Sequence, residues 1–88
     1  MKIIITFELH KTGKSYDVQV TKKQKIEDTL QILAENIADF SFDNNSIEIR
    51  EKYTGRKLSE KNTYQEEQIY SGTKIVIQEE IWKQKMEH

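Results

Sequence analysis

The sequence contains no cysteine and no proline, and it has only three glycines. Without cysteine, a disulfide framework, a thiolate zinc site and a cysteine nucleophile are all excluded. Small secreted domains usually need such cross-links, so this absence favours a reducing compartment. No segment approaches the ~20 apolar residues that span a bilayer. The apolar run at Ile3 is interrupted by Thr6 and Glu8, too soon for a signal peptide. We therefore expect a cytoplasmic protein without direct membrane insertion.

An excess of charge of either sign is also missing. The 14 basic and 15 acidic residues give a formal net charge of -1, whereas a nucleic-acid-binding domain is expected to carry a basic face. We expect no nucleic-acid partner. A chain of 88 residues with 35% hydrophobic residues forms one small core. Such a core leaves little room for a buried active site, so we expect no enzyme activity and no cofactor.

Two alternating stretches predict an N-terminal β-hairpin. Ile3–Leu9 carries apolar residues at its odd positions, which is the period of a strand with one buried face. Ser15–Val20 alternates again, with Tyr16, Val18 and Val20 on its apolar face. Gly13 lies between the two stretches and can adopt the positive φ that a short hairpin turn requires.

A change of period predicts one amphipathic helix that begins near Ile26. The apolar positions of its stripe are Ile26, Leu30, Leu33, Ala34 and Ile37. Carboxylates at Glu27 and Asp28 suit the positive end of a helix dipole. We expect the helix to end within residues 38–46, where Asp, Asn and Ser offer competing hydrogen bonds. Phe40 and Phe42 are expected to fold back over the end of the core.

The second half of the chain predicts short strands separated by polar turns. Ser46–Tyr53 reads as a half-exposed strand, and Thr73–Gln78 reads as the last strand. Between them, the apolar residues expected to point inward are Leu58, Tyr64 and Ile69. The first and last strands carry the most apolar runs, so we expect them to pair in the middle of the sheet. This order predicts an α+β fold of the β-grasp type: a mixed sheet of four to five strands, with one main helix packed across it.

The chain resembles ubiquitin over about residues 3–78. "TGKSYDVQV" (Thr12–Val20) matches the first hairpin turn and second strand of ubiquitin. "GRKLSEKNTYQEEQI" (Gly55–Ile69) is similar to the segment that holds its glycine turn, inward leucine, threonine-plus-hydrophobe corner and isoleucine. Ile75 and Ile77 fall at the spacing of the core leucines in its last strand. The resemblance implies a ubiquitin-like domain over residues 1–78 and a C-terminal extension over residues 79–88.

Two departures from ubiquitin concern its function. Ubiquitin and the sulfur carriers work through a C-terminal diglycine, and the matching positions here hold Lys83 and Gln84. Side chains at those positions would block the narrow channel of an activating enzyme. The apolar receptor-binding patch of ubiquitin is replaced by Lys11 and Gln78 at the matching positions. The resemblance therefore implies neither conjugation nor ordinary binding to ubiquitin receptors.

The sequence is also similar to the YukD (EsaB) family of small bacterial ubiquitin-like proteins associated with type VII (ESAT-6-like) secretion. The opening "ITFELHKTGKSYDVQV" (Ile5–Val20) carries this likeness, together with the missing diglycine. It implies a cytosolic accessory or regulatory protein that acts by non-covalent contact with a secretion component.

Other motifs are better explained as ordinary surface. His10 and His88 are the only histidines, and no converging ligands accompany either one, so we expect no metal site. Gly13 and Gly55 each precede a basic residue but lie between strands, so they read as turn glycines rather than phosphate-binding loops. The lysine-rich run Thr21–Lys25 reads first as a solvated loop, with an anion or acidic-partner site as the alternative.

The two candidate protein-interaction residues are Ile4 and Trp82. Ile4 lies on the outward phase of the first strand, where Tyr53, Tyr70 and Val76 are candidates to join it in a partner surface. Trp82 is the only tryptophan, a residue type enriched at interface hot spots. Its alternatives are a continuation of the last strand or a short helix that joins Trp82 to Met86.

We expect a non-conjugating ubiquitin-like accessory protein of a bacterial type VII secretion system, a monomer or weak dimer that binds a protein partner. One alternative is a ubiquitin-like or sulfur-carrier-type modifier whose tail is first trimmed. Another is a β-grasp interaction domain unrelated to secretion, of the Ras-binding or protein-G type.

Overall fold

The alternating apolar residues near the N-terminus form the expected hairpin. In the computed structural model, which describes residues 2–38 and 47–79, β1 (Lys2–Leu9) pairs antiparallel with β2 (Ser15–Thr21). The register places Phe7 opposite Tyr16, so the apolar side chains of both strands share one face. Gly13 has a φ of 77° in the turn, and its N–H donates to the Leu9 carbonyl at 2.8 Å.

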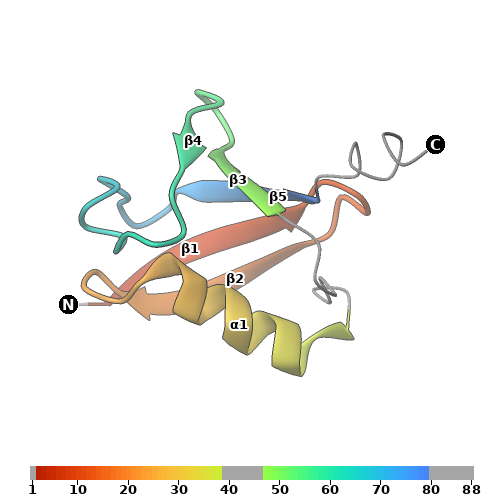
Figure 1. The fold of residues 1–88 in the computed structure, drawn as a ribbon, viewed down its shortest axis with the longest axis horizontal. Coiled ribbons are helices and arrows are strands. Elements are labelled where there is room, and N and C mark those ends of the chain that lie inside the picture. The colour runs from red at the N-terminus through yellow and green to blue at the C-terminus, as the bar shows by residue number, and fades with distance from the viewer. Residues whose placement is uncertain (1, 39–46, 80–88) are drawn as a thin grey trace.

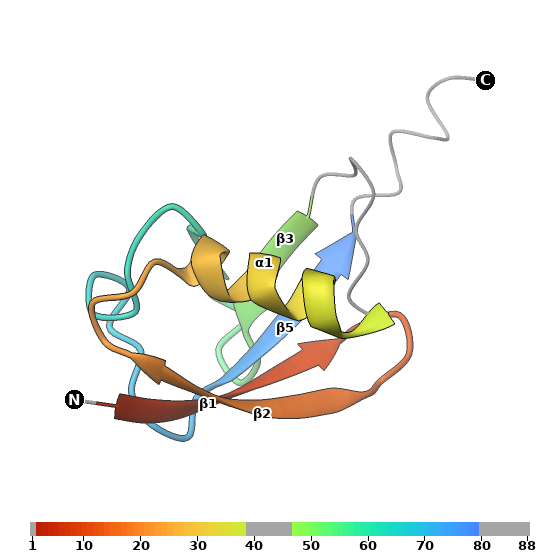
Figure 2. The ribbon, with the colours of Figure 1, turned by 90° about the horizontal axis from the view of Figure 1, so that it is seen from below.

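The helix α1 (Ile26–Asn36) packs across this face (Figures 1 and 2). Its buried residues are Ile26, Thr29, Leu30 and Leu33. Three of them belong to the expected apolar stripe, whereas the expected Ala34 and Ile37 are only partly buried and Thr29 was not expected. No side chain caps its N-terminus. Instead, the N–H of Ile26 donates to the Asn62 carbonyl at 3.0 Å and that of Glu27 to the Glu60 carbonyl at 2.9 Å. Backbone of a distant loop therefore satisfies two of the N–H groups that every helix start leaves unpaired.

Three further strands complete a mixed five-stranded sheet: β3 (Ile47–Glu51), β4 (Lys57–Leu58) and β5 (Lys74–Glu79). The strand order is β2-β1-β5-β3-β4. The first and last strands lie in the middle and run parallel, and all other neighbours are antiparallel. The predicted arrangement, one helix across a mixed sheet with the first and last strands paired, is confirmed.

The core lies between α1 and the sheet. Its fully buried side chains include the expected inward residues Ile5, Phe7, Ile75 and Ile77. The predicted anchors of the second half, Leu58, Tyr64 and Ile69, are also buried. Tyr16 and Val18 only partly enter the core, because β2 lies at the edge of the sheet.

Two element boundaries differ from the prediction. The helix ends at Asn36, before the expected range 38–46, and Ile37 is already extended with φ of -128°. The Ile37 N–H donates to the Leu33 carbonyl at 2.8 Å, which satisfies one of the last helical carbonyls, and the Asn36 amide donates to the Ile32 carbonyl at 2.8 Å. The strand expected over Ser46–Tyr53 ends at Glu51, where a turn begins. Phe40, Phe42 and Trp82 lie outside the described residues. Within the described ranges, no helix is long and apolar enough to cross a membrane.

Two hydroxyl groups are buried under the helix. Thr29 Oγ1 and Tyr64 Oη each lie out of contact with solvent, and neither completes a hydrogen bond within the described part of the chain. Burial raises the pKa of the Tyr64 phenol to about 12, an increase that the neighbouring Thr29 hydroxyl opposes and the Asp28 charge reinforces. The folded protein therefore holds the phenol proton more tightly than the unfolded chain does.

This difference predicts an alkaline loss of stability that depends on Tyr64. The contribution of the neutral phenol is fully present below about pH 10 and is lost as the pH rises towards the folded pKa. Replacing Tyr64→Phe keeps the buried ring and removes the proton, so the variant should gain roughly 2 kcal/mol over the wild type between about pH 9 and pH 12. Near neutral pH the two proteins should differ by less than about 1 kcal/mol, because the hydroxyl there has no hydrogen bond to lose.

Urea unfolding across this pH range measures the difference. Tyr53→Phe is the matched control, because Tyr53 is 73% exposed. Removing this exposed hydroxyl should leave the pH dependence of the unfolding free energy unchanged. An identical alkaline response of the wild type and Tyr64→Phe would show that the phenol is not the group responsible.

Candidate functional site: the outer face of the sheet

One face of the sheet is covered by α1, so alternate strand residues project from the opposite face, called here the outer face. Strand registry decides which residues lie side by side on it. The outer face comprises Ile4, Thr6, Glu8, Asp17, Gln19, Glu48, Arg50, Lys57, Lys74, Val76 and Gln78. These residues come from five strands, and most of them are polar.

The candidate residue Ile4 lies on the outer face with its side chain 51% exposed. Its N–H donates to Ser71 Oγ at 3.2 Å, and its carbonyl accepts the Gly72 N–H at 2.8 Å. The backbone of Ile4 is thus held on both sides while the side chain remains open to contact. The second candidate, Trp82, lies outside the described residues.

The other apolar residues do not gather around Ile4 along the strands. Val76 pairs with Glu8, four residues further along β1 than Ile4, and the Thr6–Lys74 pair lies between them. Tyr53 is on the turn after β3, and its ring lies beside Lys74. The outer face therefore presents isolated apolar side chains among polar ones.

Four basic residues lie close together on or beside the outer face. Arg50, Lys52, Lys57 and Lys74, the basic quartet, lie around Val76. Arg50 pairs with Val76 on one side and with Lys57 on the other. Lys74 precedes Val76 by two residues, and the Lys52 N–H donates to the Lys74 carbonyl at 2.9 Å.

Two carboxylates, those of Glu8 and Glu48, form ion pairs with members of the quartet. Lys52 Nζ lies 2.7 Å from Glu8 Oε1, a hydrogen bond that raises the pKa of the Lys52 ammonium group. Glu48 contacts Arg50 at 2.6 Å and Lys57 at 3.8 Å. The Arg50 hydrogen bond is the main cause that lowers the pKa of the Glu48 carboxyl below its ordinary value.

Lys74 has a different environment. Its Nζ lies 5.9 Å from the centroid of the Tyr53 ring, within reach of a cation–π contact. An ammonium group has three N–H donors, and a ring contact on one side leaves the others open. Lys74 makes no ion pair with the residues that the structure describes.

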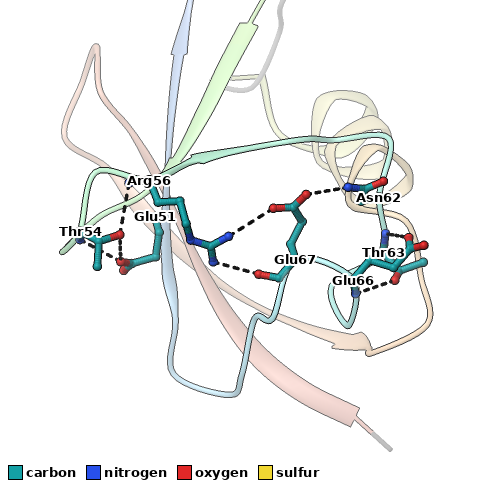
Figure 3. A network of polar contacts seen from close by, with 7 residues as sticks. All are labelled: Glu51, Thr54, Arg56, Asn62, Thr63, Glu66 and Glu67. Atoms are coloured by element: carbon teal, nitrogen blue, oxygen red, sulfur yellow. Dashed lines mark hydrogen bonds and ion pairs between the residues drawn. The ribbon is translucent and has the colours of Figure 1, made fainter.

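The turn that carries Tyr53 is held by one carboxylate, as Figure 3 shows in part. Glu51 accepts the N–H groups of Tyr53 at 3.0 Å and Thr54 at 2.9 Å, together with the Thr54 hydroxyl at 2.8 Å. These bonds, with that of the Tyr53 N–H first, lower the pKa of the Glu51 carboxyl. Gly55 then takes a φ of 74° and completes the turn.

A second group of contacts ties this turn to the loop before β5 (Figure 3). The Arg56 guanidinium contacts both the Glu67 carbonyl at 2.8 Å and its carboxylate at 3.4 Å. The same carboxylate accepts the Asn62 amide at 2.7 Å. Thr63 and Glu66 exchange reciprocal hydrogen bonds of 2.8 and 3.1 Å, in the manner of a capping box. The edge of the outer face is therefore supported by side chains from a separate loop.

The remaining sequence candidates are scattered. His10 is exposed in the first hairpin turn, and Lys11 and Gln78 are also exposed. In residues 2–38 and 47–79, no group of three candidate metal ligands comes together. The lysine-rich loop Thr21–Lys25 is held by backbone bonds from Tyr64 and Gln65, and it lies apart from the quartet.

Sequence reasoning did not find the basic quartet. Its members come from three strands and a turn, and only strand registry brings Lys57 and Lys74 to one surface. The one available signal was the outward phase of Arg50 and Lys74, opposite to the buried Ile49 and Ile75.

No protein-family model matches the sequence, and no curated protein matches it. Among solved structures, the chain is similar to the UBL domain of Plasmodium falciparum Dsk2, with a TM-score of 0.68 and 19% identity over 91% of this chain and 100% of that one. A de novo design based on ubiquitin has a TM-score of 0.69 and 19% identity, over 89% of this chain and 88% of that one. ATBAG1, solved in complex with HSP70, has a TM-score of 0.69 and 9% identity, over 97% of this chain and 44% of that one. These likenesses show a ubiquitin-like β-grasp fold, as the sequence predicted.

The Glu51 contacts predict an acid-sensitive turn. A carboxyl whose pKa is lowered by folding contributes stability above its unfolded value, near pH 4.5, and loses it as the pH falls through the folded value. Glu51→Gln should therefore unfold at lower denaturant concentration than the wild type near neutral pH. The difference should shrink as the pH is lowered towards about 3.

Denaturant unfolding of both proteins along the pH series tests this expectation. Glu35→Gln on the exposed side of α1 serves as the control, because within the described part of the chain Glu35 accepts a single side-chain hydrogen bond, of 3.4 Å from Gln31. A Glu51→Gln deficit that stays constant down to the lowest pH would contradict the assignment.

Proposed function

We propose that this chain is a non-enzymatic, non-conjugating ubiquitin-like accessory protein of a bacterial type VII secretion system. It acts in the cytoplasm by binding a protein partner without covalent chemistry. The observation that carries the proposal is a ubiquitin-like fold combined with the absence of glycine from residues 79–88, where Lys83 and Gln84 occupy the diglycine positions. The likeness of Ile5–Val20 to the YukD family supports the assignment to secretion.

The surface of the protein suits a binding role. The apolar face of the sheet is filled by α1, and the outer face is an open array of mixed polar, charged and isolated apolar side chains. Non-obligate protein interfaces have this mixed composition, with polar rims and a few aromatic or arginine anchors. Tyr53 and Arg50 are such groups on or beside the outer face, and Ile4 adds an exposed apolar side chain.

The first test is capture of the partner. The full chain, tagged and expressed in its native bacterium, should enrich a component of the type VII secretion machinery over a tag-only control. Intact-mass measurement of the recovered protein should show neither trimming nor an adduct. Enrichment of unrelated proteins alone would remove the secretion assignment, and a trimmed or adducted chain would favour a carrier.

The second test asks which side of the protein the partner contacts. Ile4→Glu places a charge on the outer face, and Ile32→Glu places the same charge on the exposed side of α1. The two side chains are 51% and 53% exposed, so the variants are closely matched. We expect Ile4→Glu to reduce capture of the partner by about fivefold or more, with Ile32→Glu near the wild type. The reverse ranking would move the binding surface to the helix.

A further inference from the structure

The basic quartet around Val76 indicates what chemistry the partner presents. We propose that Arg50, Lys52, Lys57 and Lys74 dock an acidic segment of the protein partner, which lies across β3 and β5 on the outer face. This inference rests on the proposed function and names the partner's chemistry. Three observations carry it: the geometry of the quartet, its surplus of positive charge and the two apolar groups beside it.

The quartet is compact because strand pairing makes it so. Arg50 and Val76 are register partners, as are Arg50 and Lys57, and paired strands lie about 4.8 Å apart. Lys74 is two residues before Val76 on the same face, and its carbonyl accepts the Lys52 N–H. Side chains two residues apart on a strand are about 7 Å apart. A short extended segment therefore spans all four cations.

The charges of the quartet exceed those of its carboxylates. The four cations have two carboxylates beside them. Glu8 pairs with Lys52, and Glu48 contacts both Arg50 and Lys57. Lys57 is 3.8 Å from its carboxylate, and among residues 2–38 and 47–79 Lys74 has a ring contact and no ion pair, so both ammonium groups retain donors. Two further carboxylates, supplied by a partner, would complete the pairing.

The helix that covers the other face of the sheet carries Glu27, Asp28 and Glu35 and no basic residue of its own. Glu27 is paired with Lys61 at 3.2 Å, so Asp28 and Glu35 supply the negative charge on this side. Positive charge on the outer face and negative charge on α1 would steer an acidic partner towards the sheet. Val76 and the ring of Tyr53 offer contacts to apolar side chains that flank the carboxylates.

An acidic protein segment fits this surface better than a nucleic acid does. The surplus is only about two charges, and Glu8 and Glu48 lie within the same face. A phosphate backbone gains affinity in proportion to the number of cations that neutralise it, whereas a few carboxylates are matched by two open lysines. The expected contact is weak and sensitive to salt, because these charges are exposed.

The experiment titrates the isotope-labelled full chain with a capped peptide of about ten residues in which glutamate alternates with alanine, at low salt. Amide shifts should centre on β3, β5 and the turn at Tyr53. Lys57→Gln/Lys74→Gln should weaken binding by about fivefold. This pair is chosen because Glu48 keeps Arg50 as its partner, so no carboxylate loses its only cation.

Lys23→Gln/Lys25→Gln is the matched control: it removes the same charge from two exposed lysines in the loop before α1. It should change the affinity by less than about twofold. Equal weakening by both double variants, or no binding to the wild type at low salt, overturns the proposal. Tighter binding of an oligothymidine of equal length at the quartet overturns it in favour of nucleic acid. Self-association that the quartet variant abolishes overturns it in favour of a second copy.

The quartet variant in the native capture separates this inference from the proposed function. A secretion component that is captured by the wild type and lost by Lys57→Gln/Lys74→Gln supports both. Equal capture by both proteins overturns the acidic-segment inference and leaves the proposed function standing. Quartet-dependent peptide binding without any captured secretion component supports the docking chemistry and removes the secretion assignment.

Discussion

The parallel pairing of β1 with β5 is the contact on which the rest of the structure depends. It joins the first strand to the last, with Phe7 beside Ile75 and Leu9 beside Ile77, and all four side chains are buried. Without it the hairpin on one side and the β3–β4 pair on the other have no common sheet, and α1 has only half a surface to cover. Because it closes most of the chain into one loop, this pairing is also the costliest to form in conformational entropy.

The same pairing decides the character of the outer face. Side chains alternate along a strand, so burial of Phe7 and Ile75 places Glu8, Lys74 and Val76 on the opposite side. Charges from distant parts of the sequence then become neighbours, as the Lys52–Glu8 ion pair across β5 illustrates. The Arg56–Glu67 contact extends this order to the loop before β5. The β1–β5 register therefore determines both which side chains pack in the core and which charges lie side by side on the outer face.

The sequence predicted the structure best where a hydrophobic period coincides with a local signal such as a turn glycine. The hairpin followed from strict alternation around Gly13, the helix from its apolar stripe, and the buried positions of Leu58, Tyr64 and Ile69 from their place as apolar residues in a polar segment. The end of the helix was placed too late, because the Asp-, Asn- and Ser-rich signal used for it lies beyond Ile37, where the backbone is already extended. The quartet was missed because it depends on which residues of β3, β4 and β5 stand opposite one another, and periodicity does not give registry. The proposed assignment to secretion rests on the likeness of Ile5–Val20 to the YukD family, a likeness of sequence rather than of fold.

The division between inner and outer positions also explains why the fold of this protein does not determine what it binds. The inner residues, such as Ile5, Leu30 and Ile75, must fill one core, and this requirement accounts for the likeness to ubiquitin-like structures at 19% identity or less. The outer positions carry no such requirement, so a receptor patch of apolar residues and a basic quartet are equally compatible with the sheet. A match in fold therefore does not identify the partner. In the docking that we propose, the partner's chemistry is recognised by residues that the core does not constrain, Lys57, Lys74 and Val76 among them.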